Sequence, residues 1–262
     1  MQFLAAIDPL YVLAGFCVGV LVGMTGVGGG SVMTPILILL FGAHPAIAVG
    51  TDLTFAAATK TVGALVHGAA RTIDWGIVGL LAFGSLPATV TTLVVLSLFD
   101  LGGAGARGVM TLILAGTLFV TSIFLLSADG IRGRYADRLG NLHRRTTRSL
   151  TVLLGLAMGV LVTSTSVGAG AIGVTVLLLL HPKMPIARII GSDLAHAVPL
   201  TLIAGIGHWV LGTVDWTLLV DLLCGSLPGV VIGSYVAGRA RDGVVRVVLA
   251  IVLMVVAIKL AA

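Results

Sequence analysis

Long apolar stretches separated by short polar segments run along most of the chain. Two of them, residues 77–99 and 109–126, contain no charged residue. A hydrocarbon core of about 30 Å needs roughly 20 apolar residues per crossing helix, so such stretches predict transmembrane helices. The composition agrees, because 58% hydrophobic and 10% charged residues lie outside the range of soluble domains. The chain is therefore predicted to be an all-α integral membrane protein.

Similar segments recur at a separation of 141 residues, which is 140 for the earlier pair TGVG (25–28) and TSVG (165–168), so one residue is inserted between. Residues 72–75 read TIDW and residues 213–216 read TVDW, while GSLP occurs at both 84–87 and 225–228. The same separation relates GTDL at residues 50–53 to GSDL at residues 191–194. It also relates His67 to His208. Asp, His, Trp and Pro are rare here, so compositional bias does not explain the agreement. The pattern indicates an internal duplication.

Each half is predicted to contain a glycine-broken pair of short helices followed by three transmembrane helices. The predicted helices are 9–25, 29–42, 46–70, 74–98 and 107–127 in the first half, and 149–166, 168–181, 184–210, 214–237 and 243–261 in the second. The chain then divides into repeat 1 (1–127), a basic cytoplasmic loop (128–148) and repeat 2 (149–262). Both full crossing and re-entry remain open for the broken pairs.

An arginine-rich segment sets the predicted orientation. Residues 128–148 contain six arginines, which favour the cytoplasmic side of a membrane. If each broken pair returns to its starting side, three further crossings place the second half upside down relative to the first. Both termini are then extracytoplasmic. Such an inverted-topology repeat is typical of secondary transporters, although channels and scaffolds also arise by duplication.

The glycine breaks predict a place for a substrate. Residues 24–31 read MTGVGGGS and interrupt an apolar run, and residues 165–170 supply a matching break in the second half. Free amides at the start of a short helix, with the positive end of its dipole, favour an oxyanion. The residues expected to bind the substrate are these amides, nearby hydroxyls and one lysine: Thr25, Gly26, Gly28, Gly29, Gly30, Ser31, Ser164, Thr165, Ser166, Gly168, Gly170 and Lys60.

Ionisable residues within the predicted spans are the candidates for coupling. Asp52, Lys60 and His67 fall within about 80° of one another on one helix, at 100° per residue. The equivalent helix of the second half carries Asp193, His196 and His208. Charged groups at membrane depth are costly and mark functional sites, so we expect the aspartates and histidines to carry protons. A structural ion pair between Asp52 and Lys60 is the alternative.

The segment GMTGVGGGSVMTPILILLFGAHPAIAVGT, at residues 23–51, resembles the amino-terminal signature of the sulfite exporter TauE/SafE family, also called the toluene sulfonate uptake permease family. The resemblance covers nearly the whole chain and includes Pro35 and the Val-Asp-Trp stretch of the second half. It implies a multi-pass carrier of the bacterial inner membrane that moves small anions such as sulfite, sulfonates or sulfoacetate without ATP.

Other functions are weighed against this hypothesis. Carboxylates and imidazoles also bind divalent metals, so a metal-cation carrier is the main alternative. No nucleophile motif points to an enzyme, since Ser166 lies in Ser-Val-Gly and not in a G-x-S-x-G elbow. We expect no cofactor and no nucleic-acid partner. The expected partners are a small anion and the lipid bilayer, and a homodimer is left open.

Overall fold

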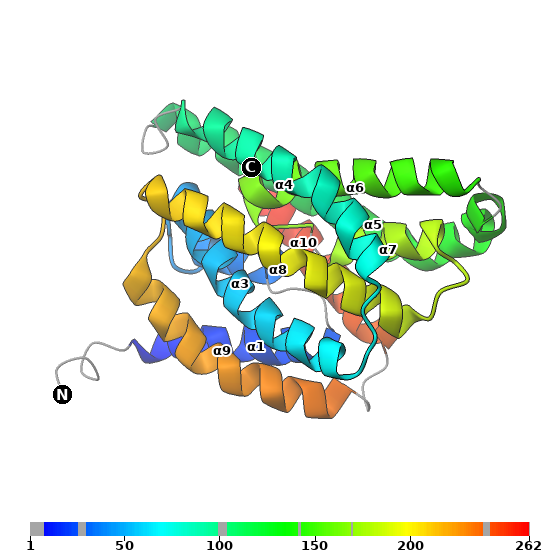
Figure 1. The fold of residues 1–262 in the computed structure, drawn as a ribbon. Helices are drawn as coiled ribbons and strands as arrows, with labels where there is room; N and C mark the ends of the chain where they lie inside the picture. The colour runs from blue at the N-terminus through cyan, green and yellow to red at the C-terminus, as the bar shows by residue number, and fades with distance from the viewer. Residues whose placement is uncertain are drawn as a thin grey trace.

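The computed structural model describes residues 8–25, 30–98, 104–140, 143–168, 170–237 and 242–261. These residues form ten α-helices and no strand (Figure 1). In chain order the helices are α1 (Pro9–Thr25), α2 (Gly30–Leu39), α3 (Pro45–Ala69), α4 (Trp75–Ser97), α5 (Ala104–Gly140), α6 (Arg144–Thr165), α7 (Ala171–Leu180), α8 (Ile186–Val210), α9 (Trp216–Ala237) and α10 (Asp242–Ala261).

The helix boundaries follow the predicted ones closely, with one exception. Residues 128–148 were expected to form a loop, but α5 continues to Gly140 and α6 begins at Arg144. The segment 128–140 contains no proline, and its three arginines and two alanines favour a helix, although its three glycines do not. The expectation of an extended basic loop was wrong, because the high charge of this segment does not prevent helix formation.

Helix boundaries recur at the separation found in the sequence. The short helices α2 and α7 each contain ten residues. They begin at Gly30 and Ala171, which are 141 positions apart, and the tryptophans that open α4 and α9 have the same separation. Ten residues correspond to about 15 Å of helix, half of a hydrocarbon core. Neither short helix is therefore long enough to cross a membrane.

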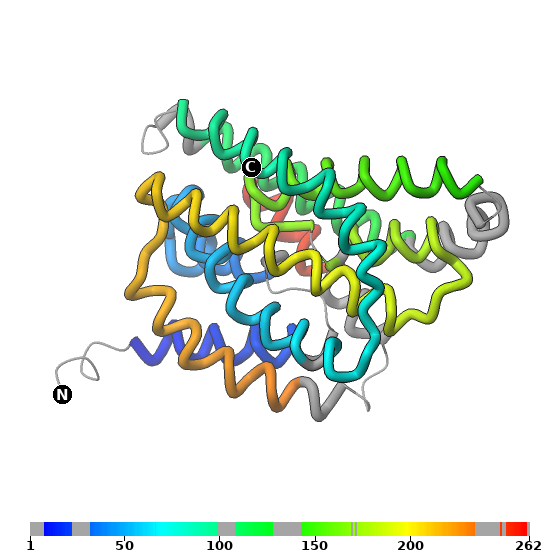
Figure 2. The backbone as a smooth tube through the Cα atoms, in the orientation of Figure 1, coloured from blue at the N-terminus to red at the C-terminus, as the bar shows by residue number. Residues whose placement is uncertain are grey.

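Helices from different parts of the chain pair side by side. The pairs are α1 with α9, α3 with α8, α4 with α6 and α5 with α10. Figure 1 shows α3 and α8 in the middle of the molecule, with α1 and α9 on one side and α4 and α6 on the other. The tube drawing in Figure 2 shows the same order. One buried apolar cluster joins α3 and α8 to α4, α6 and α7, and another joins α3 to α1, α2 and α9.

Glycines bring two of these helix pairs into close contact. A Cβ atom on Gly225 of α9 would overlap the carbonyl oxygen of Val12 on α1. A Cβ atom on Gly84 of α4 would overlap the carbonyl oxygen of Val152 on α6 in the same way. Small residues allow backbones in lipid to approach and gain dispersion contacts. Glycine therefore permits close backbone packing at these two interfaces.

Each broken pair folds back on itself. Tyr11 lies near the start of α1 and Phe41 just after α2, and their ring centroids are 4.5 Å apart. In the second half Thr151 Oγ1 lies 3.3 Å from His181 Nε2, which joins the first part of α6 to the end of α7. The two contacts involve positions separated by 140. Each pair is thus a helical hairpin whose two outer ends meet.

Apolar surface and helix length identify a membrane protein. Within the described residues, five helices are long and apolar enough to cross a bilayer: 75–97, 108–127, 144–165, 186–210 and 216–233. Large apolar side chains such as Phe83 and Leu112 are exposed on the outside of the bundle. A water-soluble protein rarely exposes so much apolar surface, whereas lipid accommodates it. The chain is a multi-pass helical membrane protein.

Candidate functional site

The second glycine break reverses the chain by means of three positive φ angles. Helix α6 ends at Thr165, and Ser166 follows with φ of +59°. Gly168 and Gly170 have φ of +116° and +105° before α7 begins. Such conformations are unfavourable for residues with a Cβ atom, whereas glycine adopts them freely. The predicted break is confirmed here, and Ser166 is held at its tip in a conformation that costs free energy.

Two symmetry-related aspartates lie beside the short helices. Asp52 and Asp193 are 0% and 1% exposed. Thr34 Oγ1 in α2 donates a hydrogen bond to Asp52 Oδ2. The backbone of Gly170, which precedes α7, contacts the Asp193 carboxylate. A side chain on Gly173 of α7 would collide with that carboxylate, so glycine makes room for it. Asp193 therefore lies against the first turn of α7, and Asp52 lies beside Thr34, the fifth residue of α2.

One lysine and one histidine complete the buried polar centre. Lys60 is 3% exposed and interacts electrostatically with Asp193 and Asp52. His196 is fully buried, and its Nε2 lies 2.8 Å from Ser85 Oγ. Three residues separate His196 from Asp193, which places both on one face of α8. Helix pairing between α3 and α8 thus brings the ionisable residues of the two halves together.

Four buried polar atoms in this region have no hydrogen-bond partner. They are Asp52 Oδ1, Ser166 Oγ, Asp193 Oδ1 and His196 Nδ1. Ser166 lies near Asp52, and Lys60 is within electrostatic range of the other ionisable groups. We call Asp52, Lys60, Ser166, Asp193 and His196 the central polar cluster. An unpaired buried polar atom costs about 1–3 kcal/mol, so several together indicate groups that await a ligand or a proton.

The ion pair between Asp52 and Lys60, considered as the alternative to proton coupling, does not form. These residues and Asp193 all lie in the described part of the chain, and no nitrogen–oxygen distance among them falls within 4.0 Å. The described residues also contain no group of three or more His, Cys, Asp or Glu arranged to hold a metal ion. The cluster therefore resembles neither a closed structural ion pair nor an assembled metal site.

Some predicted site residues are engaged elsewhere. Ser164 Oγ donates to the carbonyl of Val160, and Thr165 Oγ1 donates to that of Leu161. Thr165 Oγ1 also accepts a hydrogen bond from the amide of Val167. Both hydroxyls thus stabilise the end of α6. Of the three hydroxyl residues predicted at the second break, the structure leaves only Ser166 with an unpaired side chain.

The structure does not bring His67 and His208 to the cluster. Each lies 15 residues from its aspartate, or about 22 Å along the helix at 1.5 Å per residue. His67 Nδ1 contacts Thr72 Oγ1 and His208 Nδ1 contacts Thr213 Oγ1, both at 2.8 Å. These contacts stabilise the turns that follow α3 and α8. Their proposed part in proton coupling has no support from this geometry.

The first break is described only in part. Gly26, Gly28 and Gly29 lie outside the described residues. Thr25 belongs to the end of α1, and Gly30 and Ser31 to the start of α2. Two residues that sequence reasoning missed are Thr34, which binds Asp52, and Ser85, which contacts His196. Ser85 could have been found because it belongs to the repeated GSLP segment. For Thr34 the one available signal was its position close to the first glycine break.

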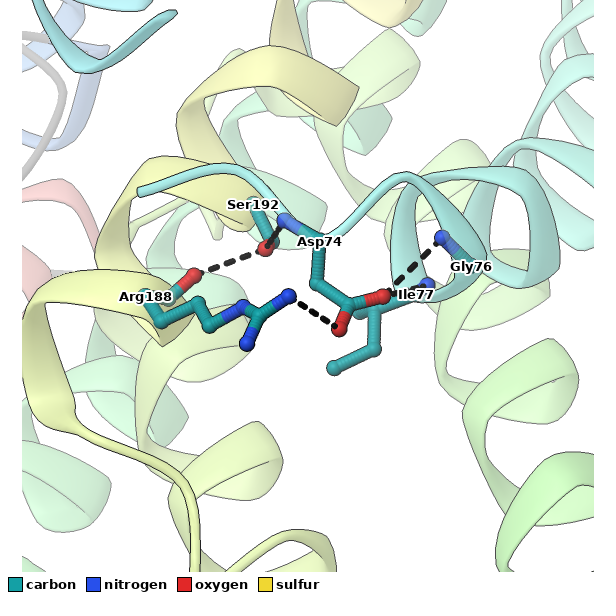
Figure 3. Close-up of polar contacts among 5 residues, drawn as sticks. All are labelled: Asp74, Gly76, Ile77, Arg188 and Ser192. Carbon is teal, nitrogen blue, oxygen red and sulfur yellow. Dashed lines mark hydrogen bonds and ion pairs between the residues drawn. The ribbon is translucent and has the colours of Figure 1, made fainter. Parts of the chain in front are cut away.

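Two equivalent hydrogen bonds cross between the halves. The amide of Asp74 donates to Ser192 Oγ at 2.8 Å, as drawn in Figure 3. The amide of Asp215 donates to Thr51 Oγ1 at 3.0 Å. Asp74 and Asp215, like Thr51 and Ser192, are separated by 141 positions. Each half therefore supplies the donor for one bond and the acceptor for the other, next to the aspartates of the cluster.

Comparison with known proteins agrees with this architecture. A sequence profile described as Sulfite exporter TauE/SafE matches residues 11–260. A probable membrane transporter protein of Bacillus subtilis, YjnA, is 35% identical over 95% of this chain and 98% of its own length. A second one from that organism, YdhB, is 30% identical over 86% of this chain and 88% of its own. No solved structure gives a significant match.

The helical bundle, its apolar exterior and its buried polar centre define a polytopic membrane transporter. The chain belongs to the sulfite exporter TauE/SafE family. The resemblance found in the glycine-rich segment is thereby confirmed over almost the full length of the protein.

Proposed function

We propose that this protein is a proton-coupled secondary transporter of a small oxyanion, of the sulfite, sulfonate or sulfoacetate type, that works by alternating access. The observation that carries the proposal is the set of four unpaired buried atoms in the central polar cluster. They belong to residues of both halves and surround the one buried lysine of the cluster. A ligand bound there would satisfy groups that the protein itself leaves unpaired.

The cluster can present several donors to an oxyanion. Lys60 offers an ammonium group and Ser166 a hydroxyl. If Ser85 donates its proton to His196 Nε2, the unpaired Nδ1 carries a hydrogen and donates into the cluster. A carboxylate can only accept, but a protonated carboxyl group becomes a donor. Protonation of Asp52 or Asp193 would thus convert a repulsive group into one that binds an anion.

The positions of the aspartates give a physical reason for coupling. The Asp193 carboxylate lies against the first turn of α7, and that of Asp52 lies beside Thr34 in the N-terminal half of α2, toward the end of each helix that favours negative charge. An incoming anion seeks the same helix ends, so carboxylate and substrate compete. A proton on the carboxylate weakens its hold on the helix and removes its charge. Proton binding therefore favours anion binding, which makes the two solutes travel together.

The two halves are proposed to form an inverted-topology repeat in the bacterial inner membrane. The exchanged hydrogen bonds Asp74–Ser192 and Asp215–Thr51 support a two-fold relation between the halves. The contacts that close both hairpins support a return of each pair to its starting side, on which the predicted orientation depends. With the 128–148 segment in the cytoplasm, both termini are extracytoplasmic. Binding at the centre of such a repeat is typical of alternating-access carriers.

Uptake into proteoliposomes tests this function. Purified protein is reconstituted, and entry of radiolabelled sulfite is followed with an inward or outward proton gradient and in its absence. We expect uptake that rises with the gradient carrying protons in the direction of sulfite entry. Unlabelled sulfonates and sulfoacetate compete for the same site. A chelator changes nothing, because no metal takes part.

Protein-free liposomes and the Lys60→Met variant serve as controls. Lys60→Met keeps much of the side-chain volume but removes the charge that holds the anion, so it should lose most of the uptake. Zinc, nickel and cobalt uptake are measured in parallel. Metal entry without sulfite entry would contradict the oxyanion proposal and establish the cation carrier instead.

A further inference from the structure

A second polar feature lies at one end of the bundle, outside the central polar cluster. It is a pocket of about 690 Å³, a volume within the usual range for small ligands. Its lining comes from the starts of α4, α6 and α8 and from the end of α7 with the turn that follows. None of the five residues of the central polar cluster contributes to it.

The lining has a strong excess of positive charge. Arg144, Arg148, Lys183 and Arg188 line the pocket, whereas Asp74 is the only acidic residue among the described residues that line it. These four basic residues and Asp74 define what we call the basic pocket. Four positive charges against one negative leave an excess of three, without counting His181. Such a concentration of like charges in one hollow is unfavourable unless anions are present.

The single carboxylate of the basic pocket is already engaged. Asp74 Oδ1 accepts hydrogen bonds from the amides of Gly76 and Ile77, so it caps its own helix. Its Oδ2 lies 3.4 Å from Arg188 Nη2, and Figure 3 shows Asp74 between that arginine and α4. Within the described residues this is the one ion pair. Arg144, Arg148 and Lys183 therefore have no ion-pair partner among the described residues.

Helix ends add to the positive potential. Three helices begin at the basic pocket, each with the positive end of its dipole toward it. Asp74 caps α4, but His143 and Pro185, which precede α6 and α8, make no side-chain capping bond. The first amides of a helix lack internal partners. Amides of α6 and α8 are thus available beside the arginines.

The equivalent corner of the first half shows that the fold does not require these charges. It keeps the aspartate at position 215 and the hydrogen bond to Thr51. The positions that correspond to Arg148, Lys183 and Arg188 are Asp8, Gly42 and Ile47, none of them basic. The same hydrogen-bonded turn is therefore built once with basic residues around it and once without them.

We propose that the basic pocket binds an oxyanion group, carried either by the phosphate of an anionic lipid headgroup or by a free anion in water. Arg144, Arg148 and Lys183 hold the charge, and the first turns of α6 and α8 add amide donors. Cytoplasmic segments of membrane proteins are generally rich in basic residues. That preference would explain basic residues at this end of the bundle, but it does not explain why four of them line one pocket. Basic pockets between membrane helices are suited to lipid headgroups.

The chain contains its own control for this site. Arg145 lies on α6 between Arg144 and Arg148 and is exposed, but it does not line the basic pocket. Arg148→Gln and Arg145→Gln therefore change the net charge equally, but only Arg148→Gln removes a residue that lines the basic pocket. The full-length protein is purified in a neutral detergent, and its thermal unfolding midpoint is followed as inorganic phosphate, dihexanoyl phosphatidylglycerol or dihexanoyl phosphatidylcholine is added.

The proposal expects the wild-type midpoint to rise with phosphatidylglycerol, and not with the zwitterionic phosphatidylcholine. Arg148→Gln weakens the apparent affinity about tenfold, as expected for loss of a charge-assisted contact, and Arg145→Gln leaves it unchanged. A midpoint that also rises with phosphate, with the same dependence on Arg148, identifies a free anion as a ligand. If phosphate has no effect, the lipid headgroup is the ligand.

Two results would overturn the proposal. One is an unchanged wild-type midpoint with both phosphate and phosphatidylglycerol. The other is an equal response of the Arg148→Gln and Arg145→Gln variants, which would place the bound anion elsewhere, for example in the central polar cluster. Lys183→Gln repeats the comparison from a different structural element and separates loss of binding from a local defect in α6.

Discussion

The amide of Asp215 donates a hydrogen bond to Thr51 Oγ1, the side chain that directly precedes Asp52 in α3. The turn before α9 is thereby tied to the helix that carries one aspartate of the central polar cluster. Asp74 and Ser192 form the same connection for α8 and Asp193. These two bonds link the two halves next to the central polar cluster. Substitutions that remove one of them therefore test how much this link contributes to stability.

Replacing Thr51 by valine should destabilise the protein. The substitution keeps the shape of the side chain and removes the acceptor for the Asp215 amide, at a cost of about 0.5–1.5 kcal/mol. The thermal midpoint of the purified protein measures the effect. Thr51→Ser retains the hydroxyl and should lie closer to the wild type than Thr51→Val. Equal stability of both variants would show that the hydrogen bond contributes little.

Replacing Asp52 by asparagine should weaken the pH dependence of sulfite uptake. Asparagine cannot bind the proton whose arrival favours the anion, so the rate becomes less sensitive to a proton gradient. Uptake into proteoliposomes is measured from about pH 5 to about pH 8, the range in which histidines and buried carboxyl groups titrate. Asp193→Asn is tested in parallel.

Asp8→Asn is the matched control for both aspartate variants. Asp8 is exposed, and its Oδ1 accepts the amide of Leu10, which asparagine can also do. This variant should keep the wild-type pH profile. An unaltered profile in Asp52→Asn would remove Asp52 from the coupling mechanism, and the same reasoning applies to Asp193.

Replacing Gly225 by alanine should separate α9 from α1. Its Cβ atom would meet backbone atoms of Val12 and Phe16, which cannot rotate away. Overpacking of this kind costs about 1–3 kcal/mol, and the loss appears as a lower thermal midpoint and yield. Gly79→Ala on α4 is the control, because nothing lies within 4 Å of its added Cβ atom. A tolerated Gly225→Ala would show that the interface can widen.

Ser166 offers a test that separates stability from binding. Its φ of +59° is unfavourable for serine, so Ser166→Gly should raise stability or leave it unchanged, whereas Ser166→Ala keeps the strained conformation. Both variants lose the unpaired hydroxyl of the central polar cluster. We expect both to weaken sulfite binding, seen as a higher KM for uptake. Normal KM values in both variants would exclude Ser166 from the substrate site.

Most helix boundaries could be predicted from the sequence, because each is marked by a local signal. The break before α7 follows from Gly168 and Gly170, and the start of α4 from Asp74, which caps it. The end of α5 was missed for the opposite reason. No proline or glycine pair stops that helix after residue 127, and its charge was taken as evidence for a loop. Local signals predict helix ends, whereas charge alone does not.

The candidate site was predicted only in part, because a shared helix face is not a shared location. Asp52 and His67 point in similar directions around α3 but lie about 22 Å apart along its axis. Contacts between helices were also invisible to sequence reasoning. Ser85 of α4 reaches His196 of α8, and no local pattern relates the two. The aspartates were found because both halves carry them, which is a long-range signal that duplication leaves in the sequence.

The two halves are alike in backbone but differ at the centre of the molecule. Thr201 occupies the position equivalent to Lys60, and Phe55 the position equivalent to His196. In a carrier built from exchanging repeats, the inward-open and outward-open forms have equal free energies only when the repeats are chemically identical. In this protein Lys60 and His196 each lack a counterpart, so under the proposed alternating-access mechanism the empty protein should rest mainly open to one side.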